Sequence, residues 1–268
     1  MSIDARLLDE LLELATALGL EAGRLLAARV DGVRESVGTK SSVTDMVTEV
    51  DRESEALIVA RLRAARPDDA IVGEEGADRD GTSGVRWVVD PLDGTTNYLY
   101  GYPAYAVSIG VEVEGEAAVG VVYDAARAKM FSAARGRGAT LDARPIAVTG
   151  KAELATALIG TGFGYDPDVR REQGRVLTHL LPAIRDVRRG GSAALDLCNV
   201  ACGRLDAFYE RGLNEWDLCA GALIVREAGG ETMGFDGRPA KVGSIIAAGP
   251  ALMAPLRELL REAGALFD

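Results

Sequence analysis

The stretch RWVVDPLDGTTNY, residues 86–98, decides how the rest of the chain is interpreted. Its apolar run Trp87-Val88-Val89 is typical of a buried strand. Asp90 stands where that strand should end, and Asp93 follows it closely. The next residues, Gly-Thr-Thr-Asn, predict a turn that leads into the first turn of a helix. Two carboxylates and the N–H groups of a helix start therefore point into one small space.

This combination predicts half of a metal-dependent phosphate site. Carboxylates repel a phosphate, whereas exposed N–H groups at a helix start attract it. A hard divalent cation reconciles the two, because Mg²⁺ binds through one or two carboxylates together with phosphate oxygens of the substrate.

Aspartyl phosphatases of the haloacid dehalogenase type are a neighbouring alternative, since they also end an apolar strand in an acidic loop, D-x-D-G-T. Here two residues separate Asp90 from Asp93, and Pro91 takes the place of the nucleophilic aspartate. The sequence thus argues against a phospho-aspartate intermediate. Pro91 also cannot extend a central ladder, so we expect the strand to end at Asp90.

Composition narrows the class of protein. The chain has 268 residues, of which 48% are hydrophobic, and a formal charge of −11. That charge disfavours nucleic acid or an anionic membrane as a partner. Three cysteines do not suggest a disulfide framework, so a reducing cytoplasm is the expected location. No apolar run approaches the roughly 20 residues of a membrane helix, and acids interrupt the N-terminal leucines where a signal peptide would be apolar.

The single histidine, His179, excludes multi-histidine zinc sites. We expect it to be an ordinary residue of a helix surface. The chemistry must then come from carboxylates, hydroxyls and a metal, because a nucleophile at neutral pH requires water whose pKa a metal has lowered.

Helical and strand patterns alternate along the chain. Apolar spacing predicts helices over 3–26, 53–65, 170–181, 193–202, 215–225 and 251–263. Strands are predicted over 71–72, 87–89, 157–160, 205–209 and 245–248, with an antiparallel meander over 105–134. Residues 135–145 are interpreted as a turn-rich connection between an N-terminal α+β half, 1–145, and a C-terminal α/β half, 146–268.

Further polar residues are candidates for the same site. Glu74 and Glu75 follow a short strand, plausibly at the sheet edge that carries Asp90. Asp51 lies near a helix start, where a cap or dipole role is the commoner explanation. Asp217 lies in the first turn of another helix, where it could simply favour the dipole. Lys40, in a polar loop, could contact a phosphate.

A second group of candidates surrounds a predicted helix start in the C-terminal half. Arg188 and Arg189 precede the small residues Gly191, Ser192 and Ala193, which leave room for a polyol or an anion.

Four segments, taken together and in register, resemble the inositol monophosphatase family, and its bacterial members most. They are GEE at 73–75, DPLDGTTN at 90–97, GSAALDLCNVACGRLDAFYE at 191–210 and WDLCAGALIVREAGG at 216–230. The resemblance spans nearly the whole chain. It implies a layered αβαβα sandwich of the inositol monophosphatase and fructose-1,6-bisphosphatase type, a homodimer, and inhibition by lithium.

The resemblance also implies two to three Mg²⁺ ions. Glu74, Asp90 and the carbonyl of Leu92 would hold the first. Asp90, Asp93 and Asp217 would hold the second, and a weaker third ion would contact Glu74.

Roles in catalysis and substrate binding follow from the same resemblance. Thr95, hydrogen-bonded to Asp51, would orient the water that attacks phosphorus, and Glu74 joins these two as a catalytic residue. The amides of Gly94 and Thr95 would bind phosphate oxygens. The substrate hydroxyls would contact Asp93, Ala193 and Glu210, and we add Arg188 from its position beside the small residues.

The expected activity is Mg²⁺-dependent hydrolysis of myo-inositol 1-phosphate, a small phosphate ester, to inositol and phosphate. Fructose 1,6-bisphosphate, histidinol phosphate and 3′-phosphoadenosine nucleotides remain alternative substrates within the same fold. A regulatory binding protein on this scaffold is a different class of function, and the complete set of acids argues against it.

Overall fold

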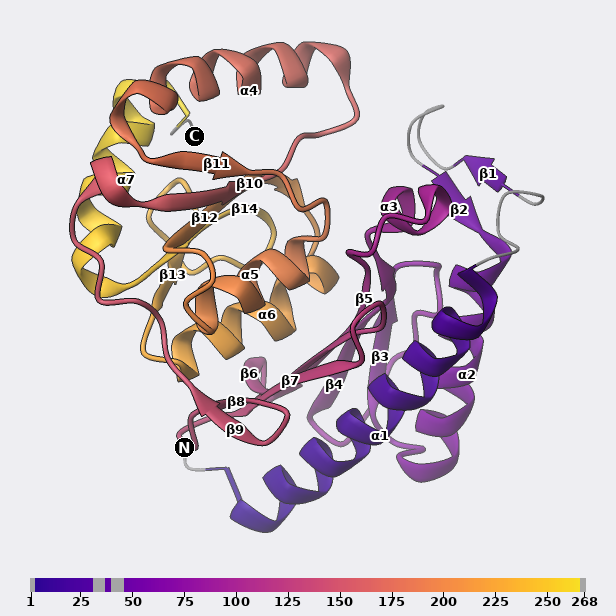
Figure 1. The fold of residues 1–268 in the computed structure, drawn as a ribbon. Coiled ribbons are helices and arrows are strands. Elements are labelled where there is room, and N and C mark those ends of the chain that lie inside the picture. Colours follow the sequence, from indigo (N-terminus) through magenta and orange to yellow (C-terminus); the bar gives the residue numbers. More distant parts are fainter. Residues whose placement is uncertain (1–2, 31–36, 40–45, 266–268) are drawn as a thin grey trace.

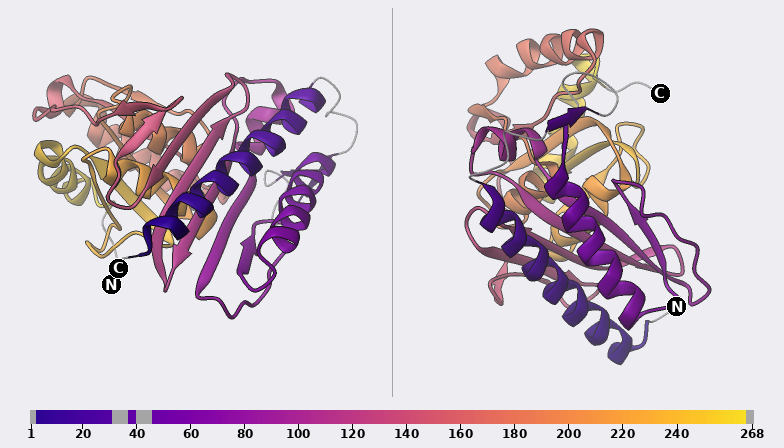
Figure 2. Two further views of the ribbon diagram at one scale, coloured as in Figure 1. Left: turned by 90° about the horizontal axis from the view of Figure 1, so that it is seen from below. Right: turned by 90° about the vertical axis from the view of Figure 1, so that its right-hand side faces the viewer.

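The computed structural model describes residues 3–30, 37–39 and 46–265. Two sheets alternate with three helical layers (Figures 1 and 2). The helices are α1 (Ala5–Arg29), α2 (Glu49–Ala65), α3 (Thr95–Tyr100), α4 (Pro167–Leu180), α5 (Ala193–Ala201), α6 (Glu215–Glu227) and α7 (Pro250–Glu262), with short 3₁₀ turns η2 (Leu154–Thr156) and η3 (Leu181–Ala183). α1 and α2 cover the outer face of one sheet, α4 and α7 cover that of the other, and α5 and α6 lie between the sheets. The expected αβαβα sandwich is confirmed.

The larger sheet has seven strands in chain order. They are β3 (Ala70–Gly73), β4 (Val85–Asp93), β5 (Ala106–Val113), β6 (Glu116–Asp124), β7 (Lys129–Ala134), β8 (Ala139–Leu141) and β9 (Arg144–Ile146). β3 pairs with β4 in parallel, with Gly73 beside Val89, so the acids that follow β3 lie at the edge where β4 carries Asp90. The expectation that 135–145 is only a connection is wrong, because β8 and β9 extend the sheet there.

β4 does not end at Asp90. The ladder with β5 is interrupted between Asp90 and Asp93 and resumes where Asp93 pairs with Ala106. Such an irregularity is one of the few places where a sheet tolerates proline. Ser54 of α2 donates to the Pro91 carbonyl at 2.9 Å and helps to satisfy the backbone there. The correction matters because the bulge re-aims the second aspartate.

The smaller sheet has the order β11-β10-β12-β14-β13. Its strands are β10 (Leu158–Thr161), β11 (Asp186–Arg188), β12 (Ala207–Leu213), β13 (Glu231–Met233) and β14 (Gly243–Ala248). β10 is parallel to both its neighbours. Successive side chains of β12 face opposite layers: Phe208 packs with the cluster around α5 and α6, and Tyr209 packs with that around α4 and α7.

The polar segment before α2 differs from its expectation. β1 (Val37–Thr39) and β2 (Met46–Thr48) form a small antiparallel pair where only a loop is expected, and Lys40 lies outside the described residues.

α6 approaches β5 and β6 closely, since a Cβ at Gly120 would lie 2.6 Å from the Ala220 carbonyl. That contact fixes how far α6 stands from β4.

Candidate metal and phosphate site

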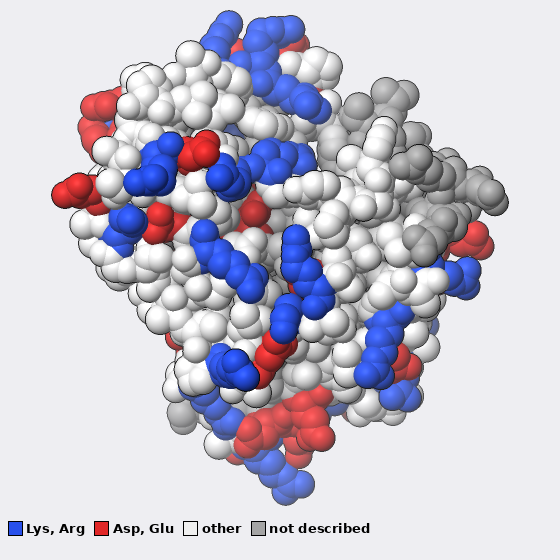
Figure 3. Space-filling view, in the orientation of Figure 1, with Lys and Arg blue, Asp and Glu red and all other residues white. Residues whose placement is uncertain are grey.

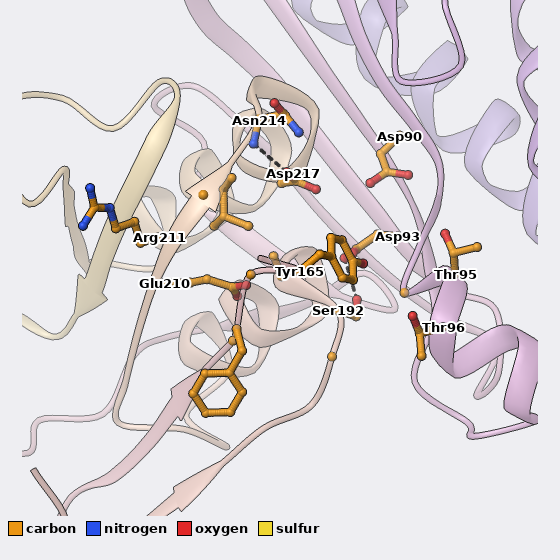
Figure 4. A pocket seen from close by; sticks show the side chains of 18 of the residues that line it. Asp90, Asp93, Thr95, Thr96, Tyr165, Ser192, Glu210, Arg211, Asn214 and Asp217 are labelled. Carbon is orange, nitrogen blue, oxygen red and sulfur yellow. Dashed lines mark hydrogen bonds between the residues drawn. The ribbon is translucent and has the colours of Figure 1, made fainter. Parts of the chain in front are cut away.

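Three acids from two layers meet at one end of β4. Asp90, Asp93 and Asp217 each offer a carboxylate oxygen, and these oxygens all lie within 4.8 Å of one another. They line a cavity of about 550 Å³ together with Glu74, Leu92 and residues of the β10–α4 loop. Figure 4 shows the side chains of Asp90 and Asp217 facing each other across the cavity, with Asp93 below them. The structure therefore brings together the acids that the sequence places far apart.

Backbone and hydroxyl donors hold these carboxylates in place. The Leu92 amide donates to Asp90 Oδ1 at 3.0 Å. Asp93 Oδ2 accepts from Ser192 Oγ at 2.6 Å and from the Ala194 amide at 2.7 Å, both at the start of α5. Asp217 and Asn214 form a capping box at the start of α6. In it, the backbone N–H of Asn214 donates to Asp217 Oδ2 at 2.7 Å. Asp217 therefore caps α6 and belongs to the acidic cluster at the same time.

The acidic cluster fits a divalent cation. Burial, followed by the charges of Glu74 and Asp93, raises the pKa of Asp90 well above its usual range. Burial also raises the pKa of Asp93 to about 6, although Ser192 and the Ala194 amide oppose the shift. A cation among hard oxygen donors removes this repulsion and restores the charged forms. The donors present are therefore those that Mg²⁺ prefers.

Thr95 stands at the other side of the cavity, at the start of α3. Its hydroxyl lies 3.2 Å from Asp51 Oδ1 and 3.2 Å from the Leu92 carbonyl. Asp51 is fully buried in the first turn of α2. The expected Thr95–Asp51 hydrogen bond is present.

The turn expected to bind phosphate differs from its expectation in one respect. α3 has 6 residues, so an attraction for phosphate would come from the individual N–H groups of the turn rather than from a long helix dipole. Gly94 caps α3 with φ of 90°, a left-handed conformation that favours glycine.

Five of the six residues expected around the substrate line the acidic cavity. Asp93, Gly94, Thr95, Ala193 and Glu210 do so, whereas Arg188 does not. Arg188 pairs with Asp186 at 2.8 Å and lines a neighbouring cavity of about 440 Å³ with Arg127 and Arg204.

Arg189 takes the place expected of Arg188 in the acidic cavity. Adjacent residues of an extended segment face opposite sides, and the sequence alone does not say which of the two faces the cavity.

Sequence reasoning gave no specific role in the site to Ser192, Tyr165 or Asp196. Ser192 was named only for its small size, although a serine at a helix N-cap is a recognisable donor. Tyr165 lines the cavity and is among the side chains drawn in Figure 4, and its loop carries no sequence signal for that position. Asp196 is buried near Asp93, and burial raises its pKa to about 7.

Glu210 lies within β12 rather than after it. Burial, with the charge of Asp217 second, raises the pKa of Glu210 to about 8. It is therefore largely protonated at neutral pH in the absence of a cation.

An αβαβα sandwich that gathers carboxylates beside an amide-rich turn defines a class of metal-dependent phosphatases. The chain belongs within that class to the inositol monophosphatase family, whose model matches residues 7–265.

Individual relatives agree with this assignment. An inositol-1-monophosphatase of Mycobacterium bovis is 50% identical over 222 residues, which cover 80% of this chain and 77% of the relative. A protein of Pasteurella multocida named Nus factor SuhB is 39% identical, covering 92% of this chain and 94% of its own. The crystal structure of the extragenic suppressor protein suhB of Bartonella henselae superimposes with a TM-score of 0.89 at 35% identity, covering 94% of this chain and 99% of that one.

Within the described ranges, no helix has both the length and the apolar character needed to cross a membrane.

Proposed function

We propose that the protein is a Mg²⁺-dependent phosphomonoesterase that hydrolyses myo-inositol 1-phosphate and related monophosphates. The convergence of Asp90, Asp93 and Asp217 on one cavity is the observation that carries this proposal. Two to three Mg²⁺ ions would be held by Glu74, Asp90, the Leu92 carbonyl, Asp93 and Asp217. When bound, they supply Lewis acidity, a water of lowered pKa and charge for the leaving oxygen.

Thr95 and Asp51 orient the attacking water. When the Thr95 hydroxyl donates to Asp51 Oδ1, its lone pairs can accept a hydrogen bond from water in the cavity. A water fixed in this way has one lone pair directed toward a phosphorus that the Gly94 and Thr95 amides position. Buried Asp51 keeps the hydroxyl in the accepting orientation and can take up part of the positive charge as the proton leaves.

The opposite wall of the cavity suits a polyol. Glu210 and Asp93 can exchange hydrogen bonds with neighbouring hydroxyls, and Ala193 leaves room beside them. Arg189 adds a cation on this wall in place of Arg188. A ring that carries several hydroxyls satisfies more of these groups than a linear alcohol does.

Three further properties belong to the same proposal. The resemblance to the family supports inhibition by lithium and a homodimer. The small number of cysteines supports a reducing cytoplasm.

Phosphate release from a panel of esters tests the proposal. The panel contains myo-inositol 1-phosphate, fructose 1,6-bisphosphate, histidinol phosphate and a 3′-phosphoadenosine nucleotide, each with Mg²⁺ and with a chelator. We expect turnover of inositol phosphate that needs Mg²⁺ and that Asp217→Asn lowers at least about 100-fold, a loss comparable to that of a main electrostatic group.

Asp236→Asn, which changes an exposed acid that does not line the cavity, is the matched control and should keep full activity. Turnover of histidinol phosphate or the nucleotide alone would correct the substrate and leave the site intact. Turnover that does not depend on Mg²⁺ would refute the proposed metal site.

A regulatory binding function is the second candidate, and the relative named Nus factor SuhB favours it. Figure 3 shows Lys and Arg side chains gathered across the middle of one face, despite the negative net charge. Specific retention of a protein or RNA partner by wild type that turns over none of the panel would support this candidate. Retention that is equal for an unrelated acidic protein would count against it.

A further inference from the structure

The β10–α4 loop and the first turn of α4 form one side of the acidic cavity. Phe163, Tyr165 and Val169 line the cavity on this side, and we call them the apolar shelf. Tyr165 and Val169 are 43% and 39% exposed, and they are two of the six large hydrophobic residues that are exposed in the described parts of the chain. Exposed apolar side chains that gather at a concave site are typical of ligand pockets, whereas single ones elsewhere on a surface need no explanation.

The shelf begins where the proposed contacts to the polyol end. A Cβ at Gly162 would lie 2.0 Å from Glu210 Oε1, so the loop starts directly against the carboxyl group that faces the substrate hydroxyls. Gly162 and Glu210 both line the acidic cavity, as the shelf does. A substituent of the alcohol that extends past Glu210 therefore comes next to the shelf.

Hydrogen bonds to α4 hold the loop in place. The Gly164 amide donates to Gln173 Oε1 at 2.9 Å. The Asp166 carboxylate caps α4 and accepts from the amides of Asp168 and Val169 at 2.8 and 3.0 Å. A surface that its own scaffold fixes loses less conformational entropy when a ligand binds. The shelf is therefore organised before a substrate arrives.

The chemistry of the shelf suits an aromatic ring better than a ring of hydroxyls. Two of its three members, Phe163 and Tyr165, are aromatic, and contacts between aromatic rings are more stable than their buried area alone predicts. Arg189 lines the same cavity, and a planar guanidinium can stack on the face of a ring. Hydroxyl groups placed against Phe163 and Val169 would lose water without gaining a hydrogen-bond partner.

We propose that the monophosphates which this site hydrolyses include esters whose alcohol carries an aromatic ring, and that Tyr165 is the main residue that selects them. The ring packs against the apolar shelf, while the α3 turn holds the phosphate. The ester and water give the aromatic alcohol and inorganic phosphate, so the reaction needs no further reactant. This inference rests on the proposed phosphomonoesterase function and names a substrate class for the same site.

Phosphate release from three esters that share a primary leaving oxygen tests the proposal in Mg²⁺. 2-Phenylethyl phosphate has an aromatic ring, 2-cyclohexylethyl phosphate has an apolar ring that is not aromatic, and propyl phosphate has no ring. We expect kcat/KM of the wild type to be highest for the phenylethyl ester and about tenfold lower for the propyl ester. The difference should lie mainly in KM, because the ring binds equally well in the ground state and the transition state.

Variants of the shelf assign this preference to particular side chains. Tyr165→Ala should lower the ratio of kcat/KM between the phenylethyl and propyl esters by about 3- to 10-fold, as expected for one aromatic contact. Tyr165→Phe keeps the ring and should keep the ratio, which separates packing from an effect of the hydroxyl. Val169→Ser should also lower the ratio, and it replaces Tyr165→Ala if that variant does not fold. Tyr100→Ala changes an exposed tyrosine that does not line the acidic cavity and should keep the wild-type ratio.

The outcomes separate this inference from the function on which it rests. Equal kcat/KM for the phenylethyl and propyl esters, with normal turnover of myo-inositol 1-phosphate, would overturn the shelf and leave the phosphatase function standing. A ratio that falls as much in Tyr100→Ala as in Tyr165→Ala would overturn it too. Equal kcat/KM for the phenylethyl and cyclohexylethyl esters would overturn the choice of an aromatic ring. Phosphate release from none of these esters, myo-inositol 1-phosphate included, would refute the proposed function and this inference with it.

Discussion

Asp93 links the larger sheet to the helical layer between the two sheets. It ends β4, yet the donors to its Oδ2 atom are Ser192 and the Ala194 amide at the start of α5. A carboxylate that accepts two short hydrogen bonds is held in one orientation, which lowers the cost of presenting it to a cation. Its position therefore depends on α5 as much as on β4.

Replacement of Asp93 by asparagine tests its part in metal binding. We expect Asp93→Asn to abolish turnover and to weaken Mg²⁺ binding while the fold stays intact, since the side chain keeps its volume but loses its charge. Ser192→Ala should act in the same direction, with Mg²⁺ affinity lower by about 10- to 100-fold, because it removes only a group that orients the ligand. Isothermal titration with Mg²⁺ and far-UV circular dichroism measure the two effects. Unchanged activity in Asp93→Asn would contradict the metal role.

The pKa of Glu210 predicts how the stability of the metal-free protein depends on pH. A folded-state pKa of about 8, above the value of 4.5 for an unperturbed glutamate, means that the folded state holds the proton more tightly. The stabilisation from proton binding is complete below pH 4.5 and is lost as pH rises toward 8. Asp93, with a pKa of about 6, acts in the same direction.

We therefore expect the melting temperature of metal-free protein to fall as pH rises through this range, and to fall less steeply in Glu210→Gln. Saturating Mg²⁺ should flatten the wild-type profile. Parallel profiles for wild type and Glu210→Gln would show that Glu210 is not buried as described.

Residue types were the most predictable part of the site. Asp90 and Asp93 follow from their places at a strand end, and Asp217 follows from the resemblance to the family; the structure brings all three together. The choice between Arg188 and Arg189 was wrong, because it depends on the twist of one extended segment, which the sequence does not specify. The place of Tyr165 over the cavity depends on the path of a loop and had no local signal.

At the scale of elements, the spacing between α6 and the larger sheet sets the distance from Asp217 to Asp90. Gly120 of β6 faces the backbone of Ala220, and a Cβ there would lie 2.6 Å from a carbonyl oxygen that cannot move without the helix. A small residue at this position is therefore a requirement for the acidic cluster to close.

Gly120→Ala should push α6 away from the sheet. We expect a loss of about 1–3 kcal/mol in the free energy of unfolding, typical of overpacking, and a weaker affinity for Mg²⁺ because Asp217 moves with the helix. Gly174→Ala is the matched control: Gly174 lies in α4 with no atom within 4 Å of an added Cβ, so this change should stabilise by about 0.5–1 kcal/mol and leave Mg²⁺ binding unchanged. Denaturant unfolding and titration calorimetry measure both. Equal Mg²⁺ affinity in the two variants would show that α6 does not set the geometry.

Long periodic elements were easier to predict than short ones. α1, α2, α4, α5, α6 and α7 lie within a few residues of their expected ranges. β8, β9, β11 and β13 were missed, because strands of 3 residues carry too little alternation to distinguish them from turns. The continuation of β4 to Asp93 was missed because proline usually ends a strand, and only the bulge allows it to remain.

In the whole molecule, the layer of α5 and α6 packs against both sheets. The division of the sequence into two halves does not show this. One buried cluster joins Val122 and Phe131 of the larger sheet with Leu197 of α5 and Leu223 of α6. Burial of apolar surface is the main favourable contribution to folding, and here much of it lies between residues 1–145 and 146–268. We propose that these halves, although each contributes a sheet, unfold as one cooperative unit.

The chain has 2 tryptophans, and one lies in each half, so each half can be followed separately. Trp87 is buried in β4, and Trp216 lies in the first turn of α6. In Trp87→Phe the fluorescence reports the C-terminal half, and in Trp216→Phe it reports the N-terminal half. We expect the midpoint from fluorescence to coincide with that from far-UV circular dichroism within each variant. Mg²⁺ at about 100 times its Kd should raise the free energy of unfolding by about 2.7 kcal/mol for each occupied site, and by the same amount in both variants, because its ligands come from both halves. A separate, earlier transition of Trp216 in Trp87→Phe would show instead that the C-terminal half is an independent domain and that the shared layer contributes little to its stability.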